Sequence, residues 1–222
     1  MTETPPRVLF VYFTVTKQTL RVVEAMTDTF RERGCDVHQA RIEFTDTRYA
    51  DRFSRFPFRH PWLLVAGMLS PQLRHVTGQI RVPDTVREED YDLICIGSPT
   101  WWLNPCMPIR SFLESDLAGT VLAGKRFAAI VVCHRYWKSN MATVKTLGIK
   151  HGGKFVKGIH FTAAGGPIGS MLALMSYFRT GVIQDRDLGM KIPPANLQPD
   201  YHAQAQSFAN ELADGLGCGG RE

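Results

Sequence analysis

Three almost uninterrupted apolar runs constrain the fold of this chain more than any other feature. They lie at residues 7–13, 93–97 and 126–133, and a polar or glycine-containing turn follows each of them. A strand that is apolar on both faces is typical of a parallel sheet that is covered on both sides. Shorter runs at residues 37–42 and 155–161 predict two further strands.

Segments with helical spacing of apolar residues lie between and after these strands. They are residues 20–34, 107–114, 139–151, 168–179 and 200–216. Strands that alternate with helices form a parallel sheet with right-handed connections. We therefore predict an α/β fold with a doubly wound five-stranded parallel sheet of strand order 2-1-3-4-5.

Residues 44–86 do not fit this alternation. Aromatic residues, arginines and prolines follow one another there, so we predict an aromatic and basic insertion between the second and third strands, with one or two short helices. Residues 165–222 are predicted to form a C-terminal extension. No linker or internal repeat interrupts the chain, so residues 1–222 are expected to form a single domain.

Charge and cysteine usage narrow the class of protein. A net charge of +5 favours phosphorylated ligands, but without a dense Lys/Arg run it does not support nucleic-acid binding. Five irregularly spaced cysteines favour a reducing cytoplasm over a disulfide framework, and the seven histidines lack metal-binding spacing. The N-terminus does not resemble a signal peptide, and the longest uncharged stretch contains glycines and a proline. We expect a cytoplasmic protein without a bound metal.

Three loops at the carboxyl ends of the predicted strands carry the candidate chemistry. The first consists of Thr14, Val15, Thr16, Lys17, Gln18 and Thr19. Hydroxyls and free backbone N–H groups meet there at the start of a helix, which is a natural phosphate site. A helix N-cap is the simpler alternative, because caps also favour threonine.

The second loop contains two adjacent tryptophans. It consists of Ser98, Pro99, Thr100, Trp101, Trp102, Leu103 and Asn104. Both indoles cannot easily be buried in one turn, and their flat faces suit stacking on a heterocycle. The alternative is that the tryptophans belong to the core or to an interface.

The third loop adds aromatic surface and positive charge at the same edge of the sheet. It contains Cys133, His134, Tyr136 and Trp137, together with the cations Arg135 and Lys138. These cations either meet a phosphate or are solvated surface charges. Cys133 ends a buried strand, so a packed, inert thiol is the simpler interpretation than a nucleophile.

Together these loops resemble the flavodoxin family. Residues 11–19 match a strand followed by the phosphate loop S/T-x-T-G-x-T, and residues 92–102 give the more specific match. The resemblance covers most of residues 7–161 and implies a flavodoxin-like sheet that binds FMN. It implies that Thr14, Thr16, Gln18 and Thr19 hold the phosphate. The ring would then lie between the second loop, from Pro99 to Trp102, and the third loop, with His134, Tyr136 and Trp137.

One position departs from the family pattern. Lys17 stands where the family has a glycine. If this position needs a positive φ, lysine is strained there by about 1 kcal/mol. The lysine either adds charge beside the phosphate or marks a loop that no longer binds FMN.

The resemblance implies an FMN-dependent oxidoreductase that passes reducing equivalents from NAD(P)H to a quinone-like or other planar apolar acceptor. The cofactor would carry the chemistry, which agrees with the lack of a recognisable acid or base. One alternative is a one-electron carrier that docks on a protein reductase, although small carriers of this family are typically acidic. A second alternative is a non-catalytic module that has lost FMN.

The sequence of the insertion is compatible with several structural roles. Residues 53–69 interleave aromatic and aliphatic side chains with arginines. Such a segment forms a lid over the flavin, contacts a second copy in a homodimer, packs on the sheet, or lies at a membrane surface, where aromatic residues and cations are favoured.

Overall fold

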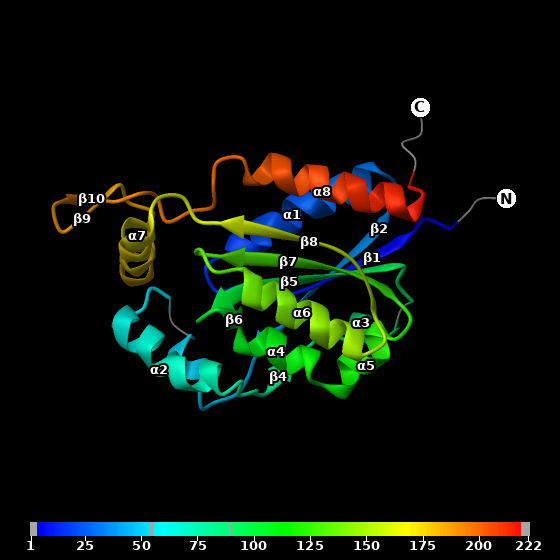
Figure 1. Cartoon of the computed structure of the whole chain (residues 1–222), viewed down its shortest axis with the longest axis horizontal. Coiled ribbons are helices and arrows are strands. Elements are labelled where there is room, and N and C mark those ends of the chain that lie inside the picture. Colours follow the sequence, from blue (N-terminus) through cyan, green and yellow to red (C-terminus); the bar gives the residue numbers. More distant parts are fainter. Residues whose placement is uncertain (1–3, 54–55, 89, 219–222) are drawn as a thin grey trace.

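The protein folds as a central sheet with helices on both faces (Figure 1). The computed structural model describes residues 4–53, 56–88 and 90–218. Positions 54–55 and 89, and the two ends of the predicted single domain, therefore lie outside the described residues. Among the residues that are described, no helix is both long enough and apolar enough to cross a membrane.

Five parallel strands form the sheet in the order β2-β1-β5-β7-β8. Their bounds are Arg7–Tyr12 for β1, Asp36–Arg41 for β2, Leu93–Trp101 for β5, Arg126–Cys133 for β7 and Lys154–Thr162 for β8. In order of appearance these are the five predicted strands, so the predicted order 2-1-3-4-5 is confirmed. A two-residue strand, β6 (Asn104–Pro105), pairs with the end of β5 in antiparallel orientation.

The helices cover the sheet in two layers (Figure 1). Their bounds are Gln18–Glu32 for α1, Pro61–Leu73 for α2, Thr85–Glu88 for α3, Met107–Leu113 for α4, Asp116–Leu122 for α5, Lys138–Lys150 for α6, Pro167–Thr180 for α7 and Tyr201–Leu216 for α8. Helices α1 and α8 pack on one face, and α4, α5 and α6 on the other. Side chains of β1 alternate between the two cores: Phe10 packs beneath α1, whereas Leu9 belongs to the opposite core.

One predicted strand end is wrong. The glycine at position 97 was expected to end its strand in a turn, but β5 continues to Trp101, and Ser98 and Pro99 still pair with Val131 and Val132 of β7. Gly97 instead allows close packing. A Cβ at this position would lie 2.7 Å from Cβ of Tyr12 and 3.1 Å from Cγ2 of Thr19.

The segment between β2 and β5 contains a small antiparallel pair at its base, and α3 follows this pair. The pair joins β3 (Glu43–Phe44) to β4 (Ile80–Arg81), with the 3-10 helix η1 (Ala50–Arg52) and α2 between them. The buried Asp46 accepts hydrogen bonds from the guanidinium of Arg48 and from the backbone N–H of Gln79. These bonds hold the pKa of Asp46 well below its usual range and fix the base of the segment.

Candidate functional site

A cavity of about 480 Å³ lies at the carboxyl ends of β1, β5 and β7. Ligands of doubly wound sheets bind at this edge. All but four of the predicted site residues line the cavity. They are Thr14, Val15, Thr16, Gln18, Thr19, Pro99, Thr100, Trp101, Trp102, Leu103, Cys133, His134 and Tyr136. The four that do not are Lys17, Ser98, Asn104 and Trp137.

The first loop presents the N-terminus of α1 to this cavity. The N-cap is Lys17, and the first intrahelical bond runs from N–H of Arg21 to O of Lys17 at 3.0 Å. The N–H groups of the three residues between them therefore have no partner within the helix. The Gln18 side chain donates to O of Ala195 at 3.3 Å, while its buried Oε1 has no partner. The start of α1 thus holds backbone donors without a partner in the helix and, in Gln18, a buried acceptor without a partner.

Lys17 adopts a left-handed conformation with φ of 61° and ψ of 2°. A β-carbon makes this conformation costly by about 1–2 kcal/mol. The exposed lysine therefore occupies a position where the backbone geometry favours glycine, as the family pattern implied.

Replacing Lys17 with glycine is expected to raise the free energy of unfolding by about 0.5–1 kcal/mol. The gain from relieving the strained backbone is partly offset because glycine makes the unfolded chain more flexible. Urea denaturation followed by circular dichroism measures the change. Lys17→Ala is the matched control, since it removes the charge and keeps the β-carbon. An equal gain in both variants would show that the charge, and not the backbone, is responsible.

The second loop is a tight hairpin between β5 and β6. Trp101 pairs with Asn104, so Trp102 and Leu103 form the two-residue turn, with φ values of 45° and 71°. Two positive φ values are typical of a type I′ turn, which usually contains asparagine and glycine. Bulky residues persist in such a strained turn only where their surroundings hold them. Here the Trp102 indole N–H donates to O of Val65 in α2 at 2.8 Å.

Trp101 faces the segment before α2. Its ring stacks on Phe53 with centroids 4.8 Å apart and an interplanar angle of 18°, and it meets Phe13 edge-on at 5.9 Å. One face of Trp101 is therefore already covered by an aromatic ring. The neighbouring Trp102, which is 38% exposed, is the freer of the two indoles.

A buried amide in α6 holds the second loop in place. Asn140 accepts a hydrogen bond from the hydroxyl of Ser98 at 2.9 Å, and its amide N–H group donates to Oγ1 of Thr100 at 2.8 Å. Ser98 therefore supports the loop from behind and does not line the cavity. Asn104 likewise turns inward, where its side chain donates to O of Trp102 at 3.4 Å. Sequence reasoning missed Asn140, because no local pattern shows that it reaches this loop.

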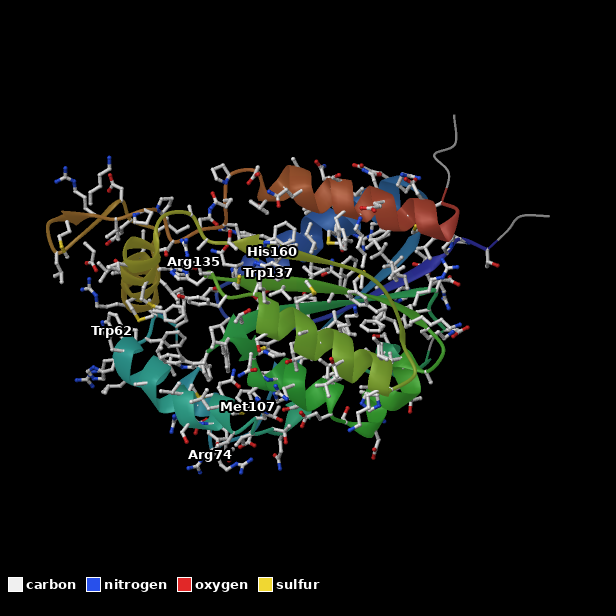
Figure 2. All side chains as sticks on the ribbon, viewed as in Figure 1. Trp62, Arg74, Met107, Arg135, Trp137 and His160 are labelled. Carbon is white, nitrogen blue, oxygen red and sulfur yellow. The ribbon has the colours of Figure 1, made fainter. Side chains whose placement is uncertain are left out.

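Most residues of the third loop line the cavity, but Trp137 does not. Cys133, His134, Arg135 and Tyr136 line the cavity, and burial raises the pKa of the Cys133 thiol to about 12. Trp137 was expected to flank the same site but stacks on His160 of β8, with centroids 4.0 Å apart (Figure 2). The reason is that Trp137 is the N-cap of α6, where the chain turns away from the cavity.

His134 brings one unpaired nitrogen to the cavity wall. Burial lowers the pKa of His134, and a hydrogen bond with the backbone of Ser170 partly opposes this effect. The buried Nε2 has no partner among the described residues. A neutral imidazole has one donor and one acceptor nitrogen, so a polar group of a ligand that reaches Nε2 can pair with it.

The lowered pKa of His134 makes stability depend on pH in a predictable direction. Below about pH 6.5 the unfolded chain binds a proton more readily than the folded chain, so the free energy of unfolding falls as the pH falls. We expect His134→Gln to reduce the loss of stability between pH 8 and about pH 5.5, measured by urea denaturation. His202→Gln, an exposed position on α8, is the control. An equal dependence of stability on pH in both variants would contradict the prediction. Burial also lowers the pKa of His160, so some dependence of stability on pH is expected to remain in His134→Gln.

Two helices cover the cavity on the side away from the sheet. We call the cavity-facing side chains of α2 and α7 the roof; they are Leu64, Val65, Met68, Met171, Leu174, Met175, Tyr177 and Phe178. The backbone N–H of Phe58, just before α2, donates to O of Phe178 at 2.7 Å, and the two rings meet edge-on at 5.3 Å. The sequence predicted α7 as an apolar helix but not its role at the site. The helical spacing of Met171, Leu174, Met175 and Phe178 is the signal that marks its cavity-facing side.

The cavity wall has no acidic side chain among the described residues. Arg135 is the charged residue that lines it, and Gln18, Asn196 and the threonines supply neutral polar groups. The guanidinium of Arg21 donates to Oδ1 of Asn196 at 2.8 Å and so ties α1 to the segment after α7. The arrangement fits a ligand with an anionic end at α1 and a planar apolar body beneath the roof.

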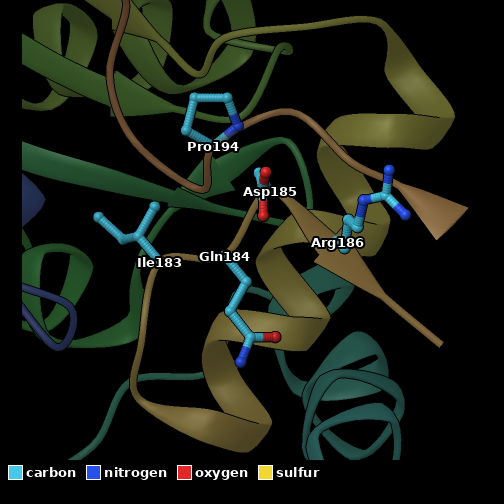
Figure 3. A pocket seen from close by; sticks show the side chains of 5 residues that line it. All are labelled: Ile183, Gln184, Asp185, Arg186 and Pro194. Atoms are coloured by element: carbon cyan, nitrogen blue, oxygen red, sulfur yellow. The ribbon is translucent and has the colours of Figure 1, made fainter. Parts of the chain in front are cut away.

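A second hollow, of about 580 Å³, lies in the segment after α7. It is lined by Ile183, Gln184, Asp185, Arg186 and Pro194, and Figure 3 shows the Ile183, Gln184 and Arg186 side chains pointing in different directions. It contains none of the predicted site residues. Because its polar groups do not converge, we place the functional site in the cavity at the strand ends.

Comparison with known proteins supports the architecture. Neither protein-family profiles nor curated protein sequences give a match. Among solved structures, a Lactobacillus acidophilus flavoprotein in complex with FMN is 16% identical, with a TM-score of 0.54 over 70% of this chain and 93% of that chain. A flavodoxin from the domain Archaea is 11% identical, with a TM-score of 0.53 over 95% and 99% of the two chains. A Streptococcus pneumoniae flavodoxin is 13% identical, with a TM-score of 0.50 over 94% and 99%. The chain therefore has a flavodoxin-like fold.

Proposed function

We propose that this protein is an FMN-dependent oxidoreductase that passes reducing equivalents from NAD(P)H to a quinone-like or other planar apolar acceptor. The observation that carries the proposal is a single cavity that joins a helix N-terminus, an aromatic wall and an apolar roof. Structures with the same fold include flavodoxins and a flavoprotein in complex with FMN, which supports flavin-based electron transfer.

Each part of FMN has complementary groups in the chain. The free N–H groups at the start of α1 and the hydroxyls of Thr14, Thr16 and Thr19 suit the phosphate. The unpaired Oε1 of Gln18 suits a hydroxyl of the ribityl chain. Trp102 and Tyr136 offer aromatic surface to the ring, and the unpaired Nε2 of His134 suits a polar group of the ring or of the acceptor.

When bound, FMN supplies the group that takes up and releases electrons. The chain binds and orients this group and keeps water away from it. The roof favours a small apolar acceptor over a protein partner, because α2 and α7 stand where a docking protein would approach the cavity. The excess of positive charge also sets the chain apart from acidic one-electron carriers.

The test begins with the visible spectrum of the purified protein, before and after incubation with FMN and removal of the excess. We expect retained flavin bands and oxidation of NADH or NADPH when a soluble quinone is added. A protein that stays colourless would overturn the proposal in favour of a non-catalytic binding module. A flavin-loaded protein that oxidises neither nucleotide with any quinone would instead indicate a carrier that needs a protein reductase.

A further inference from the structure

The outer face of α2 is apolar and exposed. Trp62 is 56% exposed, Leu63 71% and Leu73 57%, and the exposed residues between them, Ala66, Gly67 and Ser70, are small and uncharged. Residues 61–73 contain no charged side chain. A helix that is apolar on all sides is normally covered on all sides. The inner face of α2 is covered by the cavity and its surroundings. On the outer face the guanidinium of Arg52 donates to O of Gly67 at 3.3 Å, and the exposed apolar side chains have no covering element among the described residues.

Neighbouring elements extend this surface. Figure 1 places α2, α7 and the hairpin of β9 (Arg186–Asp187) and β10 (Met190–Lys191) at the same end of the molecule, and Figure 2 shows Trp62 at the outer end of α2. The most exposed large apolar side chains on the latter two elements are Ile168, at 79%, Leu188, at 84%, and Met190, at 54%. We call these three residues, with Trp62, Leu63 and Leu73, the apolar end.

The positive charge of the chain is concentrated in the same region. Residues 52–83 contain five arginines, no lysine and no acidic residue. The chain has 26 basic and 21 acidic residues, so the remainder of the chain holds 21 of each and has no net charge. The whole excess of +5 therefore lies in the segment that carries α2. The exposed Arg59 and Arg74 stand immediately beside the two ends of this helix.

We infer that the apolar end docks on the surface of an anionic phospholipid bilayer. Tryptophan and leucine side chains flanked by arginines suit the boundary between acyl chains and negatively charged headgroups. Helix α2, with 13 residues, is too short to span a bilayer and would lie in the plane of its surface. A second copy of the chain is the less favourable occupant, because it would bring the same arginines against one another.

The surface adjoins the proposed site. The residues Leu64, Val65 and Met68 on the inner face of α2 line the cavity, while Trp62 and Leu63 belong to the apolar end. Docking would therefore place the helix that carries part of the roof against the bilayer, where an apolar acceptor is concentrated. This statement about the acceptor rests on the proposed function, whereas docking itself does not.

Sedimentation with lipid vesicles tests the inference. We expect the protein to bind vesicles that contain phosphatidylglycerol, to ignore vesicles of phosphatidylcholine alone, and to dissociate at high salt. Burial of large apolar side chains in the bilayer stabilises the bound state, so Trp62→Ser with Leu63→Ser is expected to weaken binding more than tenfold. Each of Arg59→Gln and Arg74→Gln is expected to weaken it about fivefold.

Matched control variants distinguish docking through this surface from non-specific binding to vesicles. Ile149→Ser on α6 removes a side chain that is 47% exposed, and Arg31→Gln on α1 removes an exposed arginine; both are expected to bind vesicles like the unaltered chain. Equal losses in the controls, or no binding to the anionic vesicles, would overturn the inference. A dimer in sedimentation velocity that the Trp62 and Leu63 substitutions dissociate, without vesicle binding, would assign the surface to a second copy. Flavin retention, measured on the same variants, reports separately on the proposed function.

Discussion

Replacing Thr16 with glutamate is expected to lower the affinity of the protein for FMN about 100-fold while leaving its affinity for riboflavin nearly unchanged. Thr16 lines the cavity at the N-terminus of α1 and is partly exposed, so the fold tolerates the longer side chain. Two unit charges about 4 Å apart near a protein surface interact by about 4 kcal/mol, and screening reduces this repulsion to about two-thirds. Riboflavin lacks the phosphate and escapes the repulsion.

Quenching of flavin fluorescence measures both affinities in one titration format. Thr146→Glu, at an exposed position of α6, introduces the same charge away from the cavity and is the control. Equal losses for FMN and riboflavin would show that the loop has been disrupted. An unchanged affinity for FMN would show that the phosphate lies elsewhere.

Replacing Gly97 with alanine is expected to have the second large effect, on stability and on FMN together. The new methyl group would lie 2.7 Å from Cβ of Tyr12 and 3.1 Å from Cγ2 of Thr19. Neither the new Cβ nor that of Tyr12 can rotate away, because both are fixed to the backbones of neighbouring strands. We expect the free energy of unfolding to fall by about 1–3 kcal/mol and FMN to bind at least tenfold more weakly, since Thr19 is displaced.

Chemical denaturation and flavin titration of the same sample test this expectation. Gly215→Ala is the control, because a Cβ at this helical position would meet nothing within 4 Å. The control is expected to leave FMN binding unchanged and stability equal or slightly higher. A Gly97→Ala protein of normal stability would mean that β1 and β5 can move apart at little cost.

The sheet and the first loop could be predicted because their signals are local. Apolar runs such as residues 126–133 identify strands that are buried on both faces, and alternation with helices then fixes the class of fold. Lys17 was identified from the family pattern, and its left-handed backbone agrees with the conformation that a glycine there implies. Parallel strands bring their carboxyl ends to one edge, so loops far apart in sequence were expected to meet.

The rest of the site depends on contacts that the sequence does not show locally. Asn140 looks like an ordinary helical residue until α6 packs beside the second loop. Trp137 carries the aromatic signal expected of a site residue, but the start of α6 turns it toward His160. The glycine in β5 suggested a turn, whereas its role is to let Tyr12 and Thr19 approach. In each of these cases the partner comes from a distant part of the chain.

The roof contains three methionines, Met68 from α2 and Met171 and Met175 from α7. A methionine side chain is unbranched and its thioether is polarisable, so it adapts to neighbours of different shapes. The opposite wall is formed by strand ends whose backbone hydrogen bonds fix their positions. The cavity thus combines a rigid side, which sets the orientation of whatever binds there, with a compliant side. Under the proposed function, this combination would select an acceptor by flatness and apolar character, with a wide tolerance for size.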